Sequence, residues 1–300
     1  IIGAGPLQIP AIKKLKSYGM EVYACDYNVN AEGFLYADKK LLISTIDKEK
    51  VLEAAETIKP DHIITSTTDA PVVTVAYVRE KLGMQINISY KNAICATNKA
   101  EMRKRLKDCN IPIPSFFVCQ SLDDFQKMRL NFEKEYIIKP VDSAASRGVK
   151  LISNNLSQNQ LVGDYNNAVG HSRTGTVIIE EFMEGPEVSV ECIIYRGRVF
   201  VIAITDKLVC ELPYFVELGH SEPAVLKDDV KEHIEKVAIK CVEAIGIING
   251  CAHVEMKITP KGPMVVEIAA RLGGDYITSR LVPLSTGIDM VEASVDVEIG

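Results

Sequence analysis

Tryptophan is absent from this 300-residue sequence, and aromatic residues make up only 6% of it. Its uninterrupted apolar runs are all too short to cross a bilayer, so a membrane partner is not expected. The eight cysteines are scattered without a C-x-x-C pair. This arrangement favours reduced thiols over disulfides or a zinc site, and the expected location is therefore the cytoplasm.

An excess of positive charge is also missing. The chain carries 34 basic and 40 acidic residues, which gives a formal net charge of -6. This balance argues against nucleic acid or an anionic membrane surface as the main partner, so any phosphate site must be local. A hydrophobic content of 47% over this length is enough for two or three domains that bury roughly three quarters of their unfolded surface.

The first ten residues contain part of a dinucleotide-binding turn. Gly3-Ala4-Gly5 follows an apolar pair, and Asp26 lies about where a ribose-binding acid is expected. The third glycine of G-x-G-x-x-G is missing, because Gln8 occupies its place. Beyond it, short apolar runs alternate with helical patterns, which predicts a parallel sheet with helices on both faces. The expected elements are a strand ending at Ile2, a helix over 7–18, a strand over 20–26, a helix over 48–58, a strand over 62–65 and a helix over 72–82.

A basic segment after this unit predicts a hinge between domains. Thr97 or Asn98 can cap a helix that ends near Asn110, and Pro112 and Pro114 enforce an extended exit. Longer strands and an amphipathic helix dominate the second half of the chain. We expect a Rossmann-like unit over 1–92, the hinge helix and linker over 93–117, a small unit over 118–182 and a larger unit over 183–300, in a chain that continues beyond both ends.

A hairpin near the end of the sequence is predicted to place two glutamates opposite each other. The loop 260–262 has three residues and ends in glycine, a length that suits a tight connection. In that register Glu255 faces Glu267, and Lys257 and Val265 point to the same side of the sheet.

Directly opposed like charges are unfavourable in a sheet unless a cation lies between them. Directly opposed side chains lie about 5 Å apart. Two carboxylates at that distance are good oxygen ligands for Mg²⁺ that carries nucleotide phosphates. The alternative is a pair of solvated glutamates on an exposed face. Arg271 and the Gly273-Gly274 turn follow directly and favour the metal site, because they concentrate charge and tight backbone at a strand end.

Two further segments are typical of nucleotide binding. Lys139 ends an apolar strand beside a loop of small residues, 142–148, whose main-chain N–H groups can approach phosphate and which can move as a cover. Lys99 offers a second phosphate contact. The segment 177–187 combines a strand, two glutamates and Gly-Pro-Glu, a pattern that can serve an adenine edge and a ribose. The alternative for each is an ordinary surface turn or a solvated side chain.

Taken in order, these motifs closely resemble those of the ATP-grasp superfamily. The resemblance covers essentially the whole chain. It implies an α/β fold in which two α+β subdomains, the smaller acting as a lid, grip ATP after a Rossmann-like parallel βαβ domain. Members typically phosphorylate a carboxylate with ATP and let an amine displace phosphate from the acyl-phosphate. The matching motifs are NK at 98–99, IIKP at 137–140, the loop at 142–148, IEEFMEGPE at 179–187, VEMK at 254–257 and EIAARLGG at 267–274.

The resemblance also implies site roles. Arg271 and Lys139 would be catalytic, Arg271 by neutralising the transferring phosphoryl group. Glu255 and Glu267 would bind Mg²⁺ or Mn²⁺, with ATP as the cosubstrate. The residues implied to contact ATP are Lys99, Lys139, Ser143, Ser146, Arg147, Gly148, Glu180, Glu181, Met183 and Glu187.

Within that set, the resemblance assigns the adenosine contacts individually. Glu180 would accept from the adenine amino group, and Glu181 and Met183 would offer main-chain contacts. Glu187 would hold the ribose.

One departure from the family pattern concerns the metal site. Many members carry Asn two residues after the second metal glutamate, where this chain has Ala269. This form looks like the branch of L-amino-acid ligases and carbamoyl-phosphate-synthase-like proteins. Glu217 and His220, with the Gly273-Gly274 turn, are candidate substrate contacts, and Glu217 can hold an amino group. A core or loop role is the alternative for Glu217 and His220.

The function expected from this resemblance is an ATP-dependent ligase that joins a small carboxylate to an amine such as an amino acid. A homodimer is the expected assembly. The alternatives are an ATP-binding accessory protein without turnover, a carboxylase or ligase of the carbamoyl-phosphate or purine type, and an NAD-dependent oxidoreductase.

Overall fold

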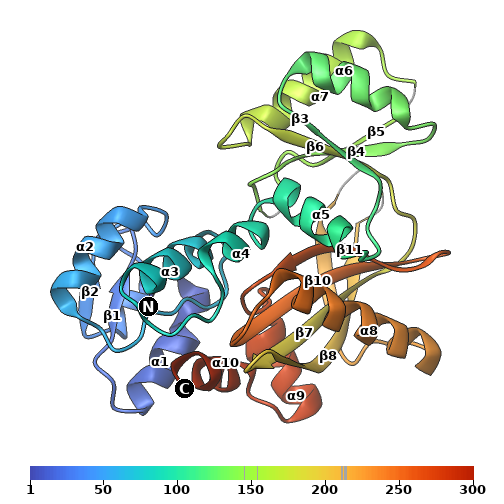
Figure 1. Ribbon diagram of the computed structural model, residues 1–300. Helices are drawn as coiled ribbons and strands as arrows, with labels where there is room; N and C mark the ends of the chain where they lie inside the picture. Colours follow the sequence, from blue (N-terminus) through green and yellow to red (C-terminus); the bar gives the residue numbers. More distant parts are fainter. Residues whose placement is uncertain (145, 154, 211, 213–214) are drawn as a thin grey trace.

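The computed structural model describes residues 1–144, 146–153, 155–210, 212 and 215–300. Figure 1 shows three parts: a blue to teal N-terminal unit at one side, a green lid at the top, and an orange to red unit built on a larger sheet. Helix α5 (Lys99–Asp108) lies where the three parts meet. Within the described residues, no helix combines the length and the apolar character that crossing a membrane requires.

The N-terminal unit is a small parallel layer flanked by helices. Strands β1 (Tyr23–Cys25) and β2 (Lys39–Leu41) pair in parallel, and Ile2 forms a parallel bridge with Cys25. The other elements are the 3-10 helix η1 (Pro6–Gln8), α1 (Ile9–Ser17), η2 (Glu32–Leu35), α2 (Lys48–Ile58), α3 (Ala70–Lys81) and α4 (Tyr90–Cys95).

The strand predicted over 62–65 is not formed as a regular strand. The N–H of Ile2 donates to the Ile64 carbonyl at 2.8 Å, so this segment does lie beside the first strand. The Ile2 carbonyl accepts from the hydroxyl of Thr65 at 2.8 Å instead of from a main-chain N–H. The side-chain bond therefore takes the place of a ladder bond, and the ladder does not continue.

The side chain of Gln8 fills the space above the partial glycine motif. It is only 3% exposed, and its amide donates to the hydroxyls of Thr67 and Thr68 at 3.1 and 3.4 Å. A Cβ on Gly3 or Gly5 would lie 3.3 or 3.1 Å from this side chain. A pyrophosphate needs that space above the turn, so the structure favours a structural turn over a dinucleotide site.

The lid is an antiparallel sheet of order β3-β6-β4-β5 covered by two helices. Its core includes Phe125, Tyr136 and Tyr165, and Phe125 stacks on Tyr165. The elements are β3 (Phe116–Cys119), α6 (Leu122–Met128), η3 (Arg129–Asn131), β4 (Tyr136–Pro140), β5 (Lys150–Ile152), α7 (Gln158–Gly170) and β6 (Val177–Glu181).

The larger unit is an antiparallel sheet of order β11-β10-β7-β8-β9. The predicted amphipathic helix forms α8 (Asp228–Ile245) and ends at Gly246, whose φ of +77° is the left-handed conformation that glycine favours. The elements are β7 (Glu187–Tyr195), β8 (Arg198–Val209), β9 (Glu217–Ser221), α8, β10 (Gly250–Thr259), β11 (Gly262–Ala269), the π-helix η4 (Ile277–Leu281), α9 (Val282–Thr286) and α10 (Met290–Ile299).

The two faces of this sheet differ in chemistry, and the difference positions the site. Alternate residues of β7 and β10, such as Val190 and Val254, join the apolar core beneath α8. On the opposite face, Ile193 and Cys251 pack with residues of α10. Further along the same face the residues are charged and include Glu187, Glu255 and Lys257; this polar area lies below the lid.

The β10–β11 hairpin differs in detail from its prediction. Thr259 pairs with Gly262, so the loop has two residues, Pro260 and Lys261, and not three. Lys257 consequently lies opposite Met264, and Val265 is fully buried, so the predicted pairing of Lys257 with Val265 is wrong.

A bulge restores the predicted pairing further along. Met256 pairs with Val265, and Glu255 pairs with Glu267, which leaves Val266 as the extra residue. The prediction that Glu255 faces Glu267 is thus confirmed, although the shorter loop alone would have shifted the register by one residue. The Val266 carbonyl accepts from Arg103 of α5 at 2.8 Å, so the hinge helix holds the bulge.

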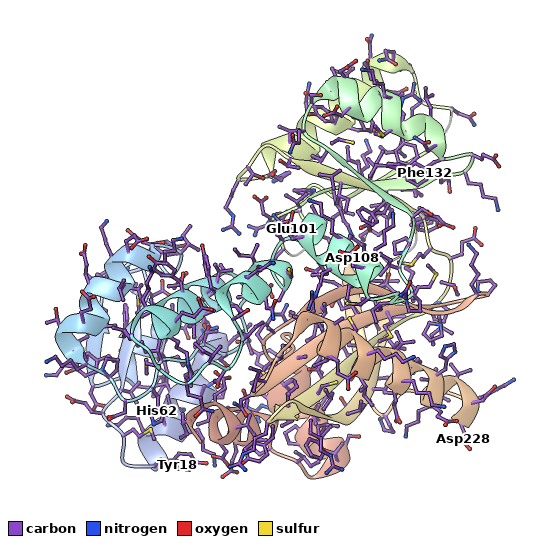
Figure 2. The ribbon with its side chains drawn as sticks, viewed as in Figure 1. Tyr18, His62, Glu101, Asp108, Phe132 and Asp228 are labelled. Atoms are coloured by element: carbon purple, nitrogen blue, oxygen red, sulfur yellow. The ribbon has the colours of Figure 1, made fainter. Side chains whose placement is uncertain are left out.

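The hinge helix begins as predicted. The Asn98 side chain accepts from the N–H groups of Ala100 and Glu101 at 3.0 and 3.2 Å. Figure 2 labels Glu101 and Asp108 near the two ends of α5, between the lid and the larger sheet. The linker that follows also contacts the sheet, because Val265 donates to the Pro112 carbonyl at 2.9 Å.

The role of Gln8 leads to a stability prediction. Gln8→Ala removes a buried amide with two hydrogen bonds and opens space above the turn, so we expect the free energy of unfolding to fall by about 1–3 kcal/mol. Urea denaturation followed by circular dichroism measures this change. Gln85→Ala removes an exposed glutamine side chain and should stay within about 0.5 kcal/mol of the parent. Equal stabilities of the two variants would contradict the structural role of Gln8.

Candidate active site

Two adjoining cavities lie below the lid. The first, of about 420 Å³, lies between β4 and β6 of the lid and the polar area of the larger sheet. The second, of about 700 Å³, extends from there to the N-terminal unit. Lys99, Arg147, Glu217 and the two predicted metal ligands line both cavities. The two spaces therefore meet where Glu255 and Glu267 face each other.

Each of the two opposed glutamates has a lysine partner. Lys99 Nζ lies 2.9 Å from Glu267 Oε1, and Lys207 Nζ lies 3.1 Å from Glu255 Oε2. Burial raises the pKa of Glu255, but Lys207 and His253 outweigh burial and hold this pKa well below its usual range. The lysines thus supply the positive charge that opposed carboxylates require.

Lys207 is a site residue that the sequence reasoning missed. Its side chain is 2% exposed, and Nζ also lies 2.7 Å from Glu217 Oε1 and 3.9 Å from Glu187 Oε2. Burial lowers the pKa of Lys207, but the nearby glutamates more than offset burial and raise it. The available signal was a lysine within the mostly apolar strand β8, which favours a buried, paired position.

A buried cluster of charges joins the hinge helix to the lid. Arg103 Nε and Nη2 donate to the two oxygens of Glu180 at 2.6 and 3.2 Å, and Lys139 Nζ lies 2.7 Å from Glu180 Oε2. Burial raises the pKa of Glu180, but the two cations outweigh burial and lower it to about 2. Burial lowers the pKa of Lys139, and Glu180 opposes this change.

This cluster changes the expectation for Glu180. Both of its carboxylate oxygens already accept from cations, so we assign the side chain to holding Arg103 and Lys139. A contact between Glu180 and an adenine amino group stays a prediction. While these ion pairs persist, we expect a main-chain carbonyl, and not the Glu180 side chain, to accept from the amino group. Arg103 was not singled out from the sequence, where it reads as one of several basic residues on the hinge helix.

The other predicted adenosine contacts line the first cavity. Glu181, Met183 and Glu187 lie along the connection from β6 to β7. The N–H of Glu181 donates to the Ser115 carbonyl at 2.9 Å, so this donor is already engaged. Glu187 Oε1 lies 3.2 Å from Lys257 Nζ, which holds its carboxylate at the cavity edge.

The predicted phosphate loop borders both cavities. Ser143 and Arg147 line both, and Ser146 lines the first. Lys99 Nζ donates to the Ser143 carbonyl at 2.9 Å and so links the loop to the hinge helix. Gly148 turns the chain with a φ of +74°, and a Cβ there would lie 3.0 Å from the His171 side chain. Ala145 of this loop lies outside the described residues.

Arg271 is held by the N-terminal unit. Its Nε and Nη2 donate to the two oxygens of Asp69 at 2.7 and 3.2 Å, and Nη1 donates to the Leu272 carbonyl at 3.0 Å. A guanidinium has five N–H groups in a fixed planar fork. These three bonds use three of the five N–H groups, so two remain available, and Arg271 lines the second cavity, where an anion could accept from them.

A fully buried glutamate, Glu191, holds the residues next to Glu255 and Arg271 in place. Glu191 contacts His253 Nδ1 and accepts from the Gly273 N–H at 3.3 Å, while His253 Nε2 lies 3.2 Å from Glu255 Oε1. Burial lowers the pKa of His253, but Glu191 and Glu255 raise it to about 9. A Cβ on Gly273 would lie 2.6 Å from Glu191, so the first glycine of the turn is a packing requirement.

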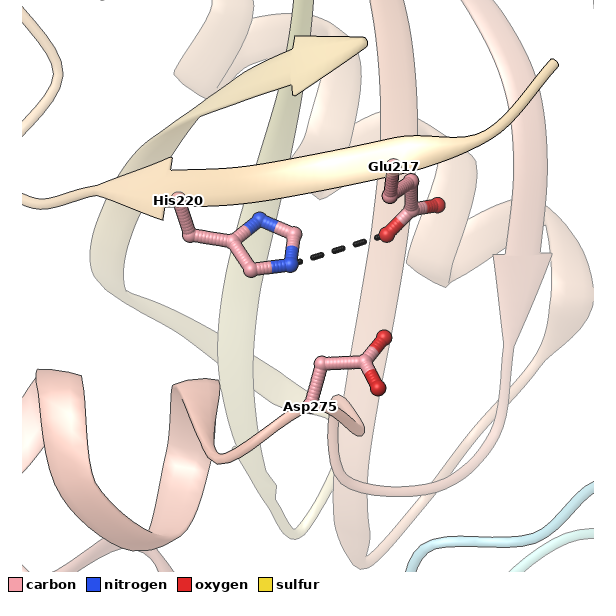
Figure 3. Close-up of side chains that lie close together, drawn as sticks. All are labelled: Glu217, His220 and Asp275. Atoms are coloured by element: carbon pink, nitrogen blue, oxygen red, sulfur yellow. Dashed lines mark ion pairs between the residues drawn. The ribbon is translucent and has the colours of Figure 1, made fainter. Parts of the chain in front are cut away.

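A third group of side chains can attract a cation. Figure 3 shows Glu217 and His220 on β9 facing Asp275, which follows the Gly273-Gly274 turn. Their ligand atoms lie within 4.8 Å of one another, and His220 Nε2 is 3.6 Å from Glu217 Oε2. The sequence had pointed to Glu217 and His220 but not to Asp275. Pro213 and Tyr214, which precede Glu217 in the sequence, lie outside the described residues.

Comparison with known proteins agrees with this geometry. A model described as an ATP-grasp domain matches residues 96–275. The chain belongs to the ATP-grasp family. The match begins just before the hinge helix and ends at Asp275, so it includes the predicted metal ligands and Arg271. The mixed α/β architecture is accordingly the ATP-grasp fold.

Similar proteins include ligases. The chain is 27% identical over 271 residues to alanine–anticapsin ligase of Bacillus subtilis (strain 168), which covers 83% of the chain and 56% of that protein. The L-amino acid ligase structure from Bacillus licheniformis aligns with a TM-score of 0.83 at 21% identity, over 99% of this chain and 73% of that one. The chain spans between 16% and 62% of the curated relatives it matches.

A second solved structure has a similar fold and a bound nucleotide. The biotin carboxylase domain of Hydrogenobacter thermophilus 2-oxoglutarate carboxylase, in complex with MgADP, aligns with a TM-score of 0.82 at 17% identity. The alignment covers 100% of this chain and 69% of that one. At these identities the likeness to the solved structures establishes the fold alone.

The buried cluster leads to a second prediction. Arg103→Met leaves Glu180 with one cation in place of two and removes the bond to the Val266 carbonyl, so we expect a loss of about 3–5 kcal/mol of unfolding free energy. Lys104→Met changes the adjacent, exposed residue and should cost less than about 1 kcal/mol. Both are measured by urea denaturation at pH 7. A loss in Arg103→Met no larger than in Lys104→Met would contradict the importance of the cluster.

Proposed function

We propose that this chain contains the ATP site of a ligase that activates a carboxylate as an acyl-phosphate and couples it to an amine. The observation that carries the proposal is the meeting of Glu255, Glu267, Lys99, Lys207 and Arg271 at the junction of two cavities. A carboxylate oxygen attacks the γ-phosphorus and ADP departs. The amine nitrogen then attacks the acyl carbon, phosphate departs, and the amine loses a proton to give the amide.

Mg²⁺ or Mn²⁺ fits the donor set at this junction. Glu255 and Glu267 offer carboxylate oxygens from adjacent strands, and hard divalent cations prefer such ligands. In the structure Lys99 and Lys207 occupy these oxygens, so the site already favours positive charge. When bound there, the metal would supply charge compensation for nucleotide phosphates. Ala269 has no polar side chain, which leaves the two glutamates as the ligands that we propose.

The first cavity suits the nucleotide. Apolar residues of the lid and linker, including Ile137, Val149 and Phe182, line one part of it, and charged residues line the other. We place adenine against the apolar part and the phosphates beside Lys99 and Lys139. The phosphate loop 142–148 then covers the phosphates, and Arg271 donates its two remaining N–H groups to the transferring group, where fixed cations stabilise developing charge.

The second cavity suits the two other reactants. We place the amine beside Glu217 and Asp275, which line this cavity, because two carboxylates attract the ammonium form of an amino acid; His220 contacts Glu217 but does not line the cavity. The carboxylate substrate lies between this group and the γ-phosphate, within reach of Arg271. Gly274 lines the same cavity, and the absence of its side chain leaves room for the substrate, whereas Gly273 packs against Glu191.

The metal ligand assignment is tested by Glu267→Gln. The variant keeps the shape of the side chain but loses its charge, so Mg²⁺-dependent ADP formation should fall by about 100-fold or more. The assay couples ADP release with pools of amino acids and small carboxylic acids. Glu243→Gln, on the exposed side of α8, should retain parental activity.

Three outcomes of this assay would contradict the proposal. Activity that survives in Glu267→Gln would overturn the metal assignment. MgATP binding by the parent without stimulation by any pool would favour an accessory protein, and stimulation by bicarbonate alone would favour a carboxylase.

The amine subsite is tested by Asp275→Asn. This variant removes one of two carboxylates near the proposed ammonium and leaves the pair between Glu217 and Lys207 intact. The KM for the amine should rise by about 10-fold, while the KM for ATP should change little. Asp61→Asn is the matched control: it makes the same change at an exposed position of the N-terminal unit outside both cavities, and it should leave both KM values unchanged. A rise in the KM for ATP alone would place Asp275 elsewhere in the reaction.

A further inference from the structure

Asp69 stands at the start of α3 but does not cap it. Aspartate is a preferred N-cap residue because its carboxylate accepts a free main-chain N–H of the first turn. Asp47 and Asp289 act in this way at the starts of α2 and α10, where they accept from Lys50 and Glu292. The Asp69 side chain makes no such bond. The departure from a local rule points to another task for this carboxylate.

That task is the contact with Arg271. The two side chains lie 202 positions apart in the sequence and join the N-terminal unit to the larger sheet through two hydrogen bonds. They are only partly exposed, at 26% for Asp69 and 15% for Arg271. A bidentate pair of arginine and carboxylate fixes the plane of the guanidinium as well as its position.

The segment that carries Asp69 is itself held in place. The Ser66 carbonyl accepts from the N–H of Leu272 at 3.3 Å, next to Arg271 in the sequence. Thr67 and Thr68 contact the buried Gln8 side chain. The glycine turn at the start of the chain, Gln8 and Asp69 therefore form one connected support for Arg271.

We propose that Asp69 is a positioning residue for the reaction, through which the N-terminal unit orients the Arg271 guanidinium toward the transferring phosphoryl group. Asp69 also lines the second cavity, but both of its carboxylate oxygens accept from Arg271, so the role that we assign to it is to hold Arg271. The inference rests on the proposed function in one respect, which is that Arg271 contacts the phosphoryl group.

The test measures phosphate binding and needs no knowledge of the substrates. The whole chain is saturated with MgADP and titrated with inorganic phosphate by calorimetry. Asp69→Asn should raise the Kd for phosphate by about 10-fold or more, because a misaligned guanidinium loses charge-assisted hydrogen bonds. The Kd for MgADP should stay within about twofold of the parent, which a general loss of structure would not allow. Asp47→Asn, at the N-cap of α2, is the matched control and should leave both values unchanged.

A double-mutant cycle separates positioning from a direct role. In an Arg271→Ala background, Asp69→Asn should have no further effect on the Kd for phosphate, because Asp69 acts only through Arg271. An equal effect in both backgrounds would overturn the inference, as would parental phosphate binding by Asp69→Asn. If the parent binds MgADP but not phosphate, the inference fails and the proposed function stands. If the parent does not bind MgADP, both fail.

Discussion

The buried contact of Glu180 with Arg103 and Lys139 is the interaction on which the site depends. Glu180 belongs to the lid, and Arg103 belongs to the hinge helix and also holds the Val266 carbonyl of the larger sheet. A charge taken out of water must be paired, so each partner restricts where the others can lie. The cluster thus sets the distance between the lid and the larger unit, and the first cavity lies between these two parts.

A second constraint follows from the first. With the halves held by α5, Lys99 reaches both the phosphate loop and Glu267, one turn of helix away from Arg103. Lys207 does the same for Glu255 and Glu217 from the other side. The charged side chains of the cleft are therefore already paired before any ligand enters. A bound metal and nucleotide would replace these ion pairs and would not require new separation of charge. Such preorganisation lowers the reorganisation that binding requires.

Several parts of this arrangement could be predicted from the sequence because they rest on local rules. The cap of the hinge helix follows from Asn98, and the amphipathic helix that forms α8 follows from its apolar period. The opposition of Glu255 and Glu267 was predicted correctly although the predicted loop was one residue too long. The bulge at Val266 shifts the register by one residue and so cancels this error. The bulge could not be predicted from the hairpin sequence, because the residue that holds it, Arg103, lies outside the hairpin.

The sequence by itself determined the fold family and many of the charged residues that line the cleft, because these depend on motifs carried by short segments. Only the tertiary structure decided how those residues are paired. Lys207 was missed because a lysine in an apolar strand indicates at most a buried, paired position, and its partners are known only when the neighbouring strands are placed. Arg103 and Asp69 were missed for the same reason. Their partners lie 77 and 202 positions away, and electrostatic pairing acts over distance in space, whatever the separation along the chain.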